Sequence, residues 1–317
     1  MSRIGILGSG SSVPERVVSN QEVGAAAGVD DAWVRRKTAI RARRWAEPGL
    51  STADLATRAA AAALTAAGID ATELTTIVVA TSTPDQPQPP TAAFVQHNLG
   101  AHHASAFDVN AVCSGFVFAL ATVEAAVARS GGYGLVVGAD IYSRILDPAD
   151  RRTVILFGDG AGAVVVGPAG RGGIQHSALH TFGELTSMIG VPAGGYFTMD
   201  GRGVREFVTT RLPLLVKQFL HDAAVAPEEI THLIPHQANG NLVAQLVTEL
   251  GLSKATAHTT VTDLGNTGAA SIPITLDSAC RTGLLRPGDK VLLAGFGGGM
   301  SVGLTLLEWG PGKERSQ

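Results

Sequence analysis

Apolar and polar positions along the chain divide it into two kinds of segment. Short, continuous apolar runs bounded by glycine, proline or polar residues predict buried strands. Ala-rich runs with helical spacing predict helices between these strands, for example over residues 55–67 and 116–128. The strand-like runs lie at 77–80, 133–138, 163–166, 233–235 and 290–294. Strands that alternate with helices in this way indicate an α/β fold.

The order of these elements repeats in the two halves of the chain. Each half has a helix, an apolar strand, a polar loop, a second helix and a short strand that leads into a turn of small residues. That turn contains Cys113 in the first half and Asn266 in the second. The repetition predicts a duplicated chain with halves at 1–170 and 171–317, although such alternation is common to all α/β proteins. If a pseudo-twofold axis relates the halves, Cys113 and Asn266 face one cleft.

Composition narrows the class of protein. Of the 317 residues, 45% are hydrophobic and 16% are charged, which suits a globular chain with a sizeable core. The net charge of −3 gives no reason to expect a nucleic-acid surface. We see neither an apolar run of about 18 residues nor a secretory signal, so we expect a cytoplasmic protein that does not enter a membrane. The two cysteines, Cys113 and Cys280, are too few for a disulfide framework.

The segment around Cys113 predicts a strand, a tight turn and a helix, with the cysteine near the helix N-terminus. There, free backbone N–H groups and the helix dipole favour an anion, and a cysteine in this position can have its pKa lowered to about 3.5–7.5. Gly115 allows a substrate to approach closely, and a backbone N–H of this turn can donate to a thioester oxyanion. The alternative is a buried structural cysteine, which is what we expect of Cys280 on its predicted amphipathic helix.

Two further polar residues stand at positions typical of α/β active sites. His236 directly follows an apolar strand, and Asn266 lies in a turn with flanking glycines. A neutral imidazole and a carboxamide both donate hydrogen bonds, so they can stabilise an enolate or a thioester oxyanion. With Cys113 they can also act as base and orienter of a nucleophile. The alternatives are a core histidine and a turn asparagine. No His, Cys and Asp cluster has metal-ligand spacing, so we expect no metal.

Five motifs resemble in sequence and order those of the β-ketoacyl-acyl-carrier-protein synthase III family, and the resemblance runs from about Ile4 to Leu307, nearly the whole chain. They are Phe107–Phe116, Phe157–Gly162, Pro235–Asn239, Gly265–Thr267 and Phe296–Gly299. The resemblance implies the thiolase fold, in which two duplicated α/β halves form an α-β-α-β-α layered arrangement, and a homodimer. It also implies an acyltransferase that uses a coenzyme A thioester as substrate and needs no cofactor.

The resemblance further implies a mechanism. Cys113 would take an acyl group from coenzyme A, and malonyl-carrier protein would then bind and lose CO₂. His236 and Asn266 would hold the malonyl thioester oxygen while the carbanion forms and attacks the acyl group on Cys113. The backbone amides of Cys113 and Gly298 match the oxyanion hole of the family.

Other residues match positions that bind the substrates in this family. Trp33 and Arg151 match residues that hold the adenine of coenzyme A, and both side chains can stack on a base. Asn239 matches a contact on the pantetheine side. Gln88 stands where the family often has an aromatic residue at the acyl pocket. Because an amide is costly to bury beside an alkyl chain, we expect a short or polar acyl group.

The chain also departs from the family pattern. Gly240-Asn241 replaces a segment with a basic residue that docks the carrier protein, Ala39 replaces a glycine, and Ser114 replaces an alanine. These changes favour a specialised relative that starts or decorates a polyketide over a housekeeping fatty-acid enzyme, within starter-unit or specialised polyketide or fatty-acid biosynthesis. A second hypothesis is an acyltransferase that passes the acyl group to an oxygen or nitrogen atom, with His236 as base. Two others are a non-catalytic subunit that binds a carrier protein, and thioester hydrolysis.

Overall fold

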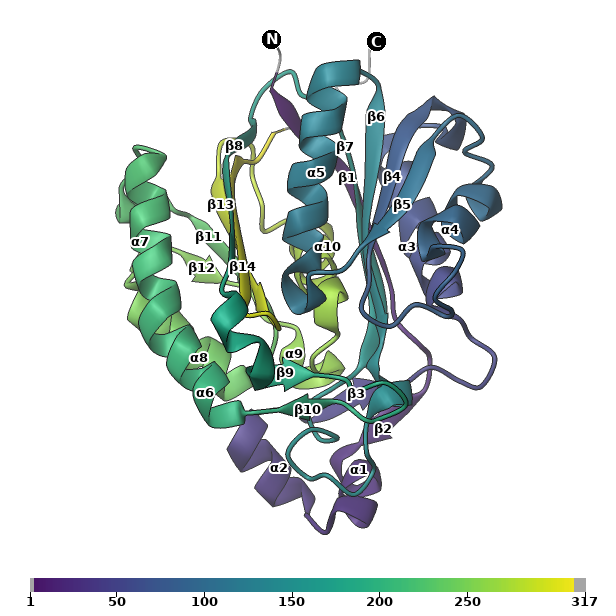
Figure 1. Cartoon of the computed structure of the whole chain (residues 1–317). Coiled ribbons are helices and arrows are strands. Elements are labelled where there is room, and N and C mark those ends of the chain that lie inside the picture. The colour runs from purple at the N-terminus through teal and green to yellow at the C-terminus, as the bar shows by residue number, and fades with distance from the viewer. Residues whose placement is uncertain (1–2, 311–317) are drawn as a thin grey trace.

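Two five-stranded sheets form the frame of the molecule in the computed structural model, which describes residues 3–310 (Figure 1). The strands of the first sheet are, in spatial order, β1 (Ile4–Ser12), β7 (Asp159–Pro168), β6 (Tyr133–Ile141), β4 (Leu74–Ala80) and β5 (Ser105–Val109). Those of the second sheet are β8 (Gly173–Thr181), β14 (Ser301–Glu308), β13 (Lys290–Gly297), β11 (His232–Pro235) and β12 (Thr256–Ala257).

The two sheets have the same topology. In the first sheet β4 is parallel to both β5 and β6, and β7 is antiparallel to β6 and to β1. In the second, β11 is parallel to both β12 and β13, and β14 is antiparallel to β13 and to β8. The matched strand order and directions show that the two halves are copies of one arrangement.

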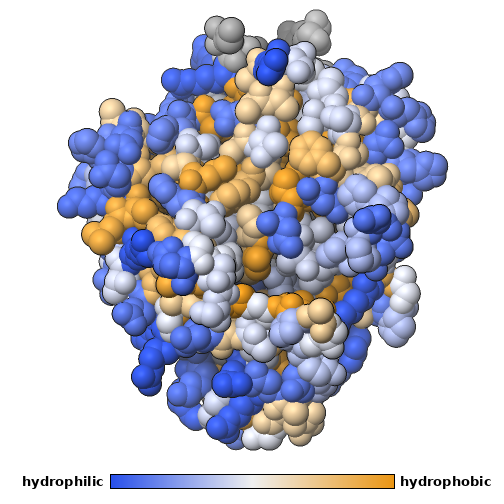
Figure 2. All heavy atoms as spheres, viewed as in Figure 1, coloured by the Kyte–Doolittle hydropathy of each residue, from blue (hydrophilic) through white to orange (hydrophobic). Residues whose placement is uncertain are grey.

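Helices complete five layers. α5 (Gly115–Ser130) and α10 (Ser271–Arg281) lie between the sheets, and their apolar side chains form one core with strands of both (Figure 1). α3 (Thr52–Ala67) and α4 (Thr91–Leu99) cover the outer face of the first sheet. α7 (Leu212–Asp222) and α8 (Gly240–Leu250) cover the outer face of the second. Figure 2 shows hydrophilic residues along most of the outline and apolar residues nearer the middle of this face.

Local sequence accounts for these helices. α3 begins with a capping box between Ser51 and Asp54, and its buried face is made mainly of alanine and leucine. It ends at Gly68, whose left-handed φ of 63° suits glycine. The segment Val112–Ser130, which includes α5, is long and apolar enough to cross a membrane, but half of its hydrophobic window is buried inside the fold. It is therefore the core helix of this domain.

The remaining elements gather at one end of the molecule, the lower end in Figure 1. They are β2 (Val17–Ser19), α1 (Asn20–Ala27), α2 (Asp31–Thr38), β3 (Ala42–Arg44), β9 (Ile189–Gly190), β10 (Thr198–Met199), α6 (Gly201–Glu206) and α9 (Val261–Leu264). A π-helical segment, Phe207–Arg211, joins α6 to α7. β5 leads into the turn that contains Cys113, and His236 directly follows β11.

The predicted architecture is confirmed. The five apolar runs lie in β4, β6, β7, β11 and β13, and the two helical runs lie in α3 and α5. The duplicated, layered α/β arrangement is also present. The division of the chain at residue 170 stays a prediction, and it falls in the connection between the end of β7 at Pro168 and the start of β8 at Gly173.

Candidate active site

Cys113 lies in a tight 3₁₀ turn, Val112–Ser114, between β5 and α5. Val112 has a φ of 48°, a left-handed conformation that is unfavourable for a β-branched residue. Strained backbone of this kind is found at functional sites, where the surrounding structure holds it in place. The turn packs against Gly268–Ala270, which follows Asn266, and against the end of β13. The fold thus brings the two equivalent turns of the duplicated halves together.

The Cys113 side chain is buried, with 6% of its surface exposed. Its Sγ lies 3.9 Å from the hydroxyl of Tyr142. Burial, together with the nearby Asp140 carboxylate, raises the pKa of Cys113 to about 12. The expectation of a lowered pKa is therefore wrong for the free protein, because desolvation and a neighbouring negative charge outweigh the helix N-terminus. The sulfur at rest is a thiol.

His236 directly follows β11 and is buried against Phe296, with the two ring centroids 5.0 Å apart. Its Nδ1 is 2.7 Å from Ser271 Oγ, which also accepts a hydrogen bond from the backbone N–H of Gln237 at 3.4 Å. With that bond accepted, the Ser271 hydroxyl can donate to Nδ1, which leaves the proton of the ring on Nε2. Burial lowers the pKa of His236 to about 3, so the imidazole is neutral at physiological pH. His236 can thus donate from Nε2 without carrying a charge.

Asn266 is held by contacts with the first half of the chain. Its backbone N–H donates to the Leu156 carbonyl at 2.8 Å, and its carbonyl accepts from Gly158 at 3.0 Å. Its side-chain Oδ1 accepts from the Gly268 N–H at 2.9 Å. Because the oxygen is occupied, the carboxamide N–H₂ is the free end of this side chain, and Asn266 lines the pocket described below.

The glycine-rich segment after β13 lies against the Cys113 turn. A Cβ on Gly297 would lie 2.7 Å from the backbone nitrogen of Cys113, so only glycine allows this approach. Ser114 Oγ lies 2.8 Å from Ser301 Oγ, and Ser301 Oγ donates to the carbonyl of Gly298 at 2.9 Å. Ser114, a departure from the family pattern, thus ties the nucleophile turn to the segment of the proposed oxyanion hole. The roles of the Cys113 and Gly298 amides stay predictions.

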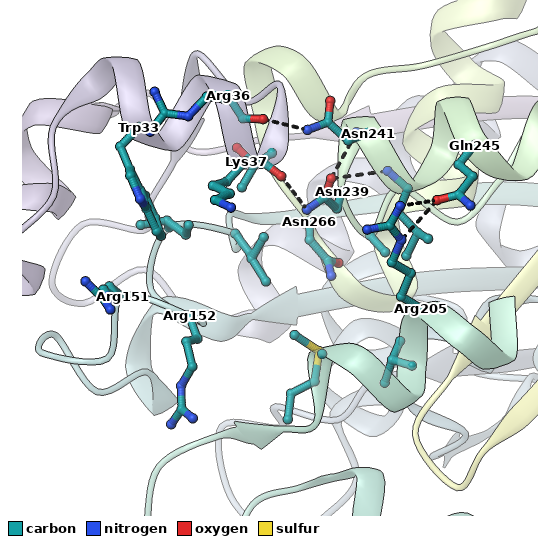
Figure 3. Close-up of a pocket in the computed structure, with 18 residues that line it drawn as sticks. Trp33, Arg36, Lys37, Arg151, Arg152, Arg205, Asn239, Asn241, Gln245 and Asn266 are labelled. Carbon is teal, nitrogen blue, oxygen red and sulfur yellow. Dashed lines mark hydrogen bonds between the residues drawn. The ribbon is translucent and has the colours of Figure 1, made fainter. Parts of the chain in front are cut away.

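A pocket of about 480 Å³ opens between α2, α8 and the segment around Arg151 (Figure 3). The Arg151 guanidinium lies 5.8 Å from the centre of the Trp33 ring. Both predicted adenine-binding side chains therefore stand on one wall, and Asn266 is at the pocket as well (Figure 3). Five cationic side chains line this space: Arg36, Lys37, Arg151, Arg152 and Arg205.

Sequence reasoning missed four of these five cations. Arg36 and Lys37 come from the basic last turn of α2, and Arg152 is next to Arg151, so their charge was visible. Their convergence with Arg205 was not, because Arg205 is on α6, about fifty residues further along the chain. A cluster of this sign suits a ligand with several phosphate groups.

The other two predicted binding residues have different surroundings. Asn239 lines the pocket, but its Oδ1 caps α8 by accepting from Asn241 and Leu242, and its Nδ2 donates to the Lys37 carbonyl at 3.4 Å. Gln88 is exposed, in the loop before α4, and it is not among the residues that line this pocket. Their substrate contacts stay predictions.

Within residues 3–310, no three His, Cys, Asp or Glu side chains are placed to hold a metal.

Comparison with known proteins places the chain in a family. The model of 3-oxoacyl-[acyl-carrier-protein] synthase III matches residues 107–183, and the model of its C-terminal part matches residues 220–309. The chain is 59% identical to acetoacetyl CoA synthase NphT7 of Streptomyces sp. (strain CL190), over 97% of this chain and 99% of that protein. It is 44% identical to a beta-ketoacyl-[acyl-carrier-protein] synthase III of Bordetella petrii, over 95% and 96% of the two chains.

Solved structures agree with this assignment. FabH from Pseudomonas aeruginosa PAO1, a 3-oxoacyl-(acyl carrier protein) synthase III, superposes with a TM-score of 0.91 at 38% identity, covering 97% of this chain and 98% of that one. The priming β-ketosynthase of the R1128 polyketide pathway superposes with a TM-score of 0.92 at 33% identity, covering 98% of each chain. The protein therefore belongs to the 3-oxoacyl-[acyl-carrier-protein] synthase III family and is a condensing acyltransferase with the thiolase fold.

Proposed function

We propose that this enzyme carries an acetyl group on Cys113 and condenses it with malonyl-coenzyme A to give acetoacetyl-coenzyme A and CO₂. The observation that carries the proposal is the cationic pocket of about 480 Å³, which Asn266 also lines. The relative at 59% identity is named an acetoacetyl CoA synthase, which fits a product that stays on coenzyme A. Loss of CO₂ from a malonyl thioester supplies the carbanion for the new carbon–carbon bond.

The first half-reaction loads Cys113. Its sulfur attacks the thioester carbonyl of acetyl-coenzyme A, and the coenzyme A thiolate leaves. The backbone N–H groups of Cys113 and Gly298 are the proposed donors to the oxyanion that forms on the way. The close approach of the β13 glycines to the Cys113 backbone supports this role.

The second half-reaction uses His236 and Asn266. The malonyl thioester oxygen would lie between His236 Nε2–H and the Asn266 carboxamide, which stabilise the enolate as CO₂ departs. Burial keeps His236 neutral, so it can donate a hydrogen bond without becoming a competing acid. The carbanion then attacks the acetyl carbonyl, and the sulfur of Cys113 is released.

A small acyl group suits the surroundings of the sulfur. Tyr142 is 1% exposed, and its ring stacks on Phe157 with centroids 4.4 Å apart and meets Phe197 edge-on at 5.8 Å. Its hydroxyl is 3.9 Å from Cys113 Sγ. An acyl chain longer than acetyl would have to displace this packed aromatic cluster, which supports the expectation of a short acyl group.

Coenzyme A is the carrier that the pocket favours for both substrates. The five cations can reach the phosphates of coenzyme A, whereas Asn241 stands where a basic residue would dock a carrier protein. The Asn241 side chain donates instead to the Arg36 carbonyl at 3.0 Å and so holds α8 against α2 (Figure 3).

The thioester itself supplies the reactive group, so this chemistry uses no further cofactor. A cytoplasmic location suits the free thiols of Cys113 and Cys280.

The test is to mix the enzyme with acetyl-coenzyme A and malonyl-coenzyme A and to measure acetoacetyl-coenzyme A and CO₂. We expect both products in equal amounts, and a much lower rate when malonyl-carrier protein replaces malonyl-coenzyme A. Condensation only with the carrier protein would contradict the choice of carrier. Acyl transfer to an oxygen or nitrogen acceptor without CO₂ would establish the non-condensing acyltransferase instead.

We also infer a homodimer formed through β5. This strand lies at the edge of the first sheet, and Phe107 on β5 and Phe94 on the adjacent α4 are 39% and 37% exposed. Unpaired edge strands with apolar side chains favour pairing with a second chain. Apolar residues also show near the middle of the face that carries α5 and β5 (Figure 2).

Phe107→Arg is expected to convert the dimer to a monomer, because it places a charge in the proposed strand pairing. Light scattering after size-exclusion chromatography measures the mass. Leu214→Arg is the matched control, because Leu214 is 68% exposed on α7, on the other side of the molecule. A variant at Phe107 that keeps the mass of the unmodified protein would contradict pairing through β5.

A further inference from the structure

A chain of hydrogen-bonding groups connects Cys113 to a buried carboxylate. The Tyr142 hydroxyl is 3.9 Å from Cys113 Sγ and 2.9 Å from Ser82 Oγ. Ser82 Oγ in turn donates to Asp140 Oδ1 at 3.1 Å. Asp140 is fully buried, and Tyr142 is 1% exposed. Two hydroxyl groups therefore join the thiol to the carboxylate, and Ser82, the half-buried member of the path, lies between two buried side chains.

The hydrogens on this path can all point in one direction. Because the Ser82 hydroxyl donates to Asp140, its oxygen is free to accept a hydrogen bond from Tyr142. The Tyr142 oxygen can then accept from the thiol of Cys113. The contact at the sulfur is long, but catalytic hydrogen bonds often shorten only when substrate is bound. These hydrogen bonds can therefore relay a proton from Cys113 to the negatively charged carboxylate of Asp140.

The position of Asp140 is fixed by several neutral donors. Its Oδ1 also accepts from the Thr83 hydroxyl at 2.8 Å and the Ser82 N–H at 2.9 Å, and its Oδ2 accepts from the Ala269 N–H at 2.8 Å. Burial nevertheless raises the pKa of Asp140 to about 6. The carboxylate is thus ionised at neutral pH and basic enough to accept a proton.

We propose that Tyr142 is a further catalytic residue, which together with Ser82 conducts the thiol proton of Cys113 to Asp140 as the acyl group arrives. This inference rests on the proposed role of Cys113 as nucleophile. Ser82 and Asp140 act through Tyr142 and do not touch the reacting atoms.

The proton transfers balance in both half-reactions. As Sγ bonds to the acyl carbon, its proton moves to Tyr142, the Tyr142 proton to Ser82, and the Ser82 proton to Asp140 Oδ1. The coenzyme A sulfur leaves with the electron pair of the broken C–S bond and takes a proton from water. When the carbanion later displaces the sulfur of Cys113, the same path runs in reverse and restores the thiol. Tyr142 gains one proton as it loses another, so it never becomes a tyrosinate.

The structure explains why such a path is needed. The raised pKa of Cys113, about 12, leaves almost no thiolate at neutral pH. His236 is a poor alternative base, because burial lowers its pKa to about 3 and Ser271 occupies its Nδ1. The titratable groups on the path are its own members, Cys113, Tyr142 and Asp140, and the other contacts of Asp140 are neutral hydroxyl and backbone groups.

The experiment is a single-turnover measurement of acetyl transfer from acetyl-coenzyme A to Cys113, followed by intact-protein mass from about pH 5 to about pH 9. In the unmodified enzyme we expect the rate to rise through about pH 6, as Asp140 ionises, and then to level off. Tyr142→Phe keeps the ring on Phe157 and removes the hydroxyl. Its rate should be about 10²-fold lower at neutral pH and should rise about tenfold for each pH unit, because the thiolate must then form by direct ionisation.

Ser82→Ala should give the same profile as Tyr142→Phe, and it serves as the second variant if the first does not fold. Tyr196→Phe removes a hydroxyl from an exposed tyrosine and should behave like the unmodified enzyme. Variants that keep the pH profile of the unmodified enzyme, at the same rate or uniformly slower, would overturn the relay and leave the nucleophile in place. An unmodified enzyme that forms no acyl adduct would overturn the proposed function, and the relay with it.

Discussion

Replacement of Cys113 by alanine is expected to abolish the acyl-enzyme and to lower condensation by about 10⁴-fold or more, because no other described side chain replaces the nucleophile at this turn. Intact-protein mass after incubation with acetyl-coenzyme A detects the adduct, and product analysis detects acetoacetyl-coenzyme A. Cys280→Ala is the matched control, since Cys280 lies on α10 beside Ser9 and Asp277, away from the pocket. We expect this control to load and condense like the unmodified enzyme.

The same experiment separates the two half-reactions. Asn266→Ala leaves the thiol in place and removes a proposed donor to the malonyl thioester oxygen. This variant should still form the acetyl adduct but should release CO₂ about 10²–10³-fold more slowly. If it instead failed to load while releasing CO₂ normally, the roles proposed for the two turns would have to be exchanged.

Gly268→Ala is expected to destabilise the protein by about 3 kcal/mol or more, since two costs combine. Gly268 has a φ of 58°, which an L side chain adopts only with strain. A Cβ there would lie 2.3 Å from Asp140 Oδ2 and 2.4 Å from Tyr142 Cε2, both on buried side chains. Gly268 therefore makes the space that the Tyr142–Asp140 pair occupies. Chemical denaturation measures the free energy of unfolding.

Gly283→Ala separates backbone strain from crowding. Gly283 has a similar φ of 67°, but nothing lies within 4 Å of its Cβ position. We expect this variant to lose only about 1 kcal/mol, the cost of the left-handed conformation. Equal losses in the two variants would show that the space around Tyr142 and Asp140 is not limiting.

Local sequence was informative wherever one segment decides its own structure. The strand that contains Val78 and the helix that contains Phe116 were predictable, because a fully buried strand is a continuous apolar run and a helix repeats its apolar face. The same apolar patterns located the tight turn at Cys113, which lies between a strand and a helix, and the strand end before His236. Asn266 could be paired with Cys113 because the order of elements repeats in the two halves.

The predicted lowering of the pKa of Cys113 was wrong because the groups that decide this pKa are distant from the cysteine in sequence. The helix N-terminus near Cys113 is a local feature, and it favours a low pKa. The groups that surround the sulfur, Tyr142 and Asp140, follow about thirty residues later and reach it only because β6 lies between β4 and β7. Burial and that carboxylate then decide the direction of the pKa shift.

The sequence by itself determined the α/β class, the duplication, the family and the three candidate catalytic residues, because apolar periodicity and short motifs depend on neighbours along the chain. Only the tertiary structure decided that Arg36, Arg152 and Arg205 meet in one pocket, that Asn239 caps α8, and that Cys113 rests as a thiol beside a path to Asp140. Pocket shape, desolvation and proton paths depend on groups that are distant in sequence and meet only when the two sheets pack around α5 and α10.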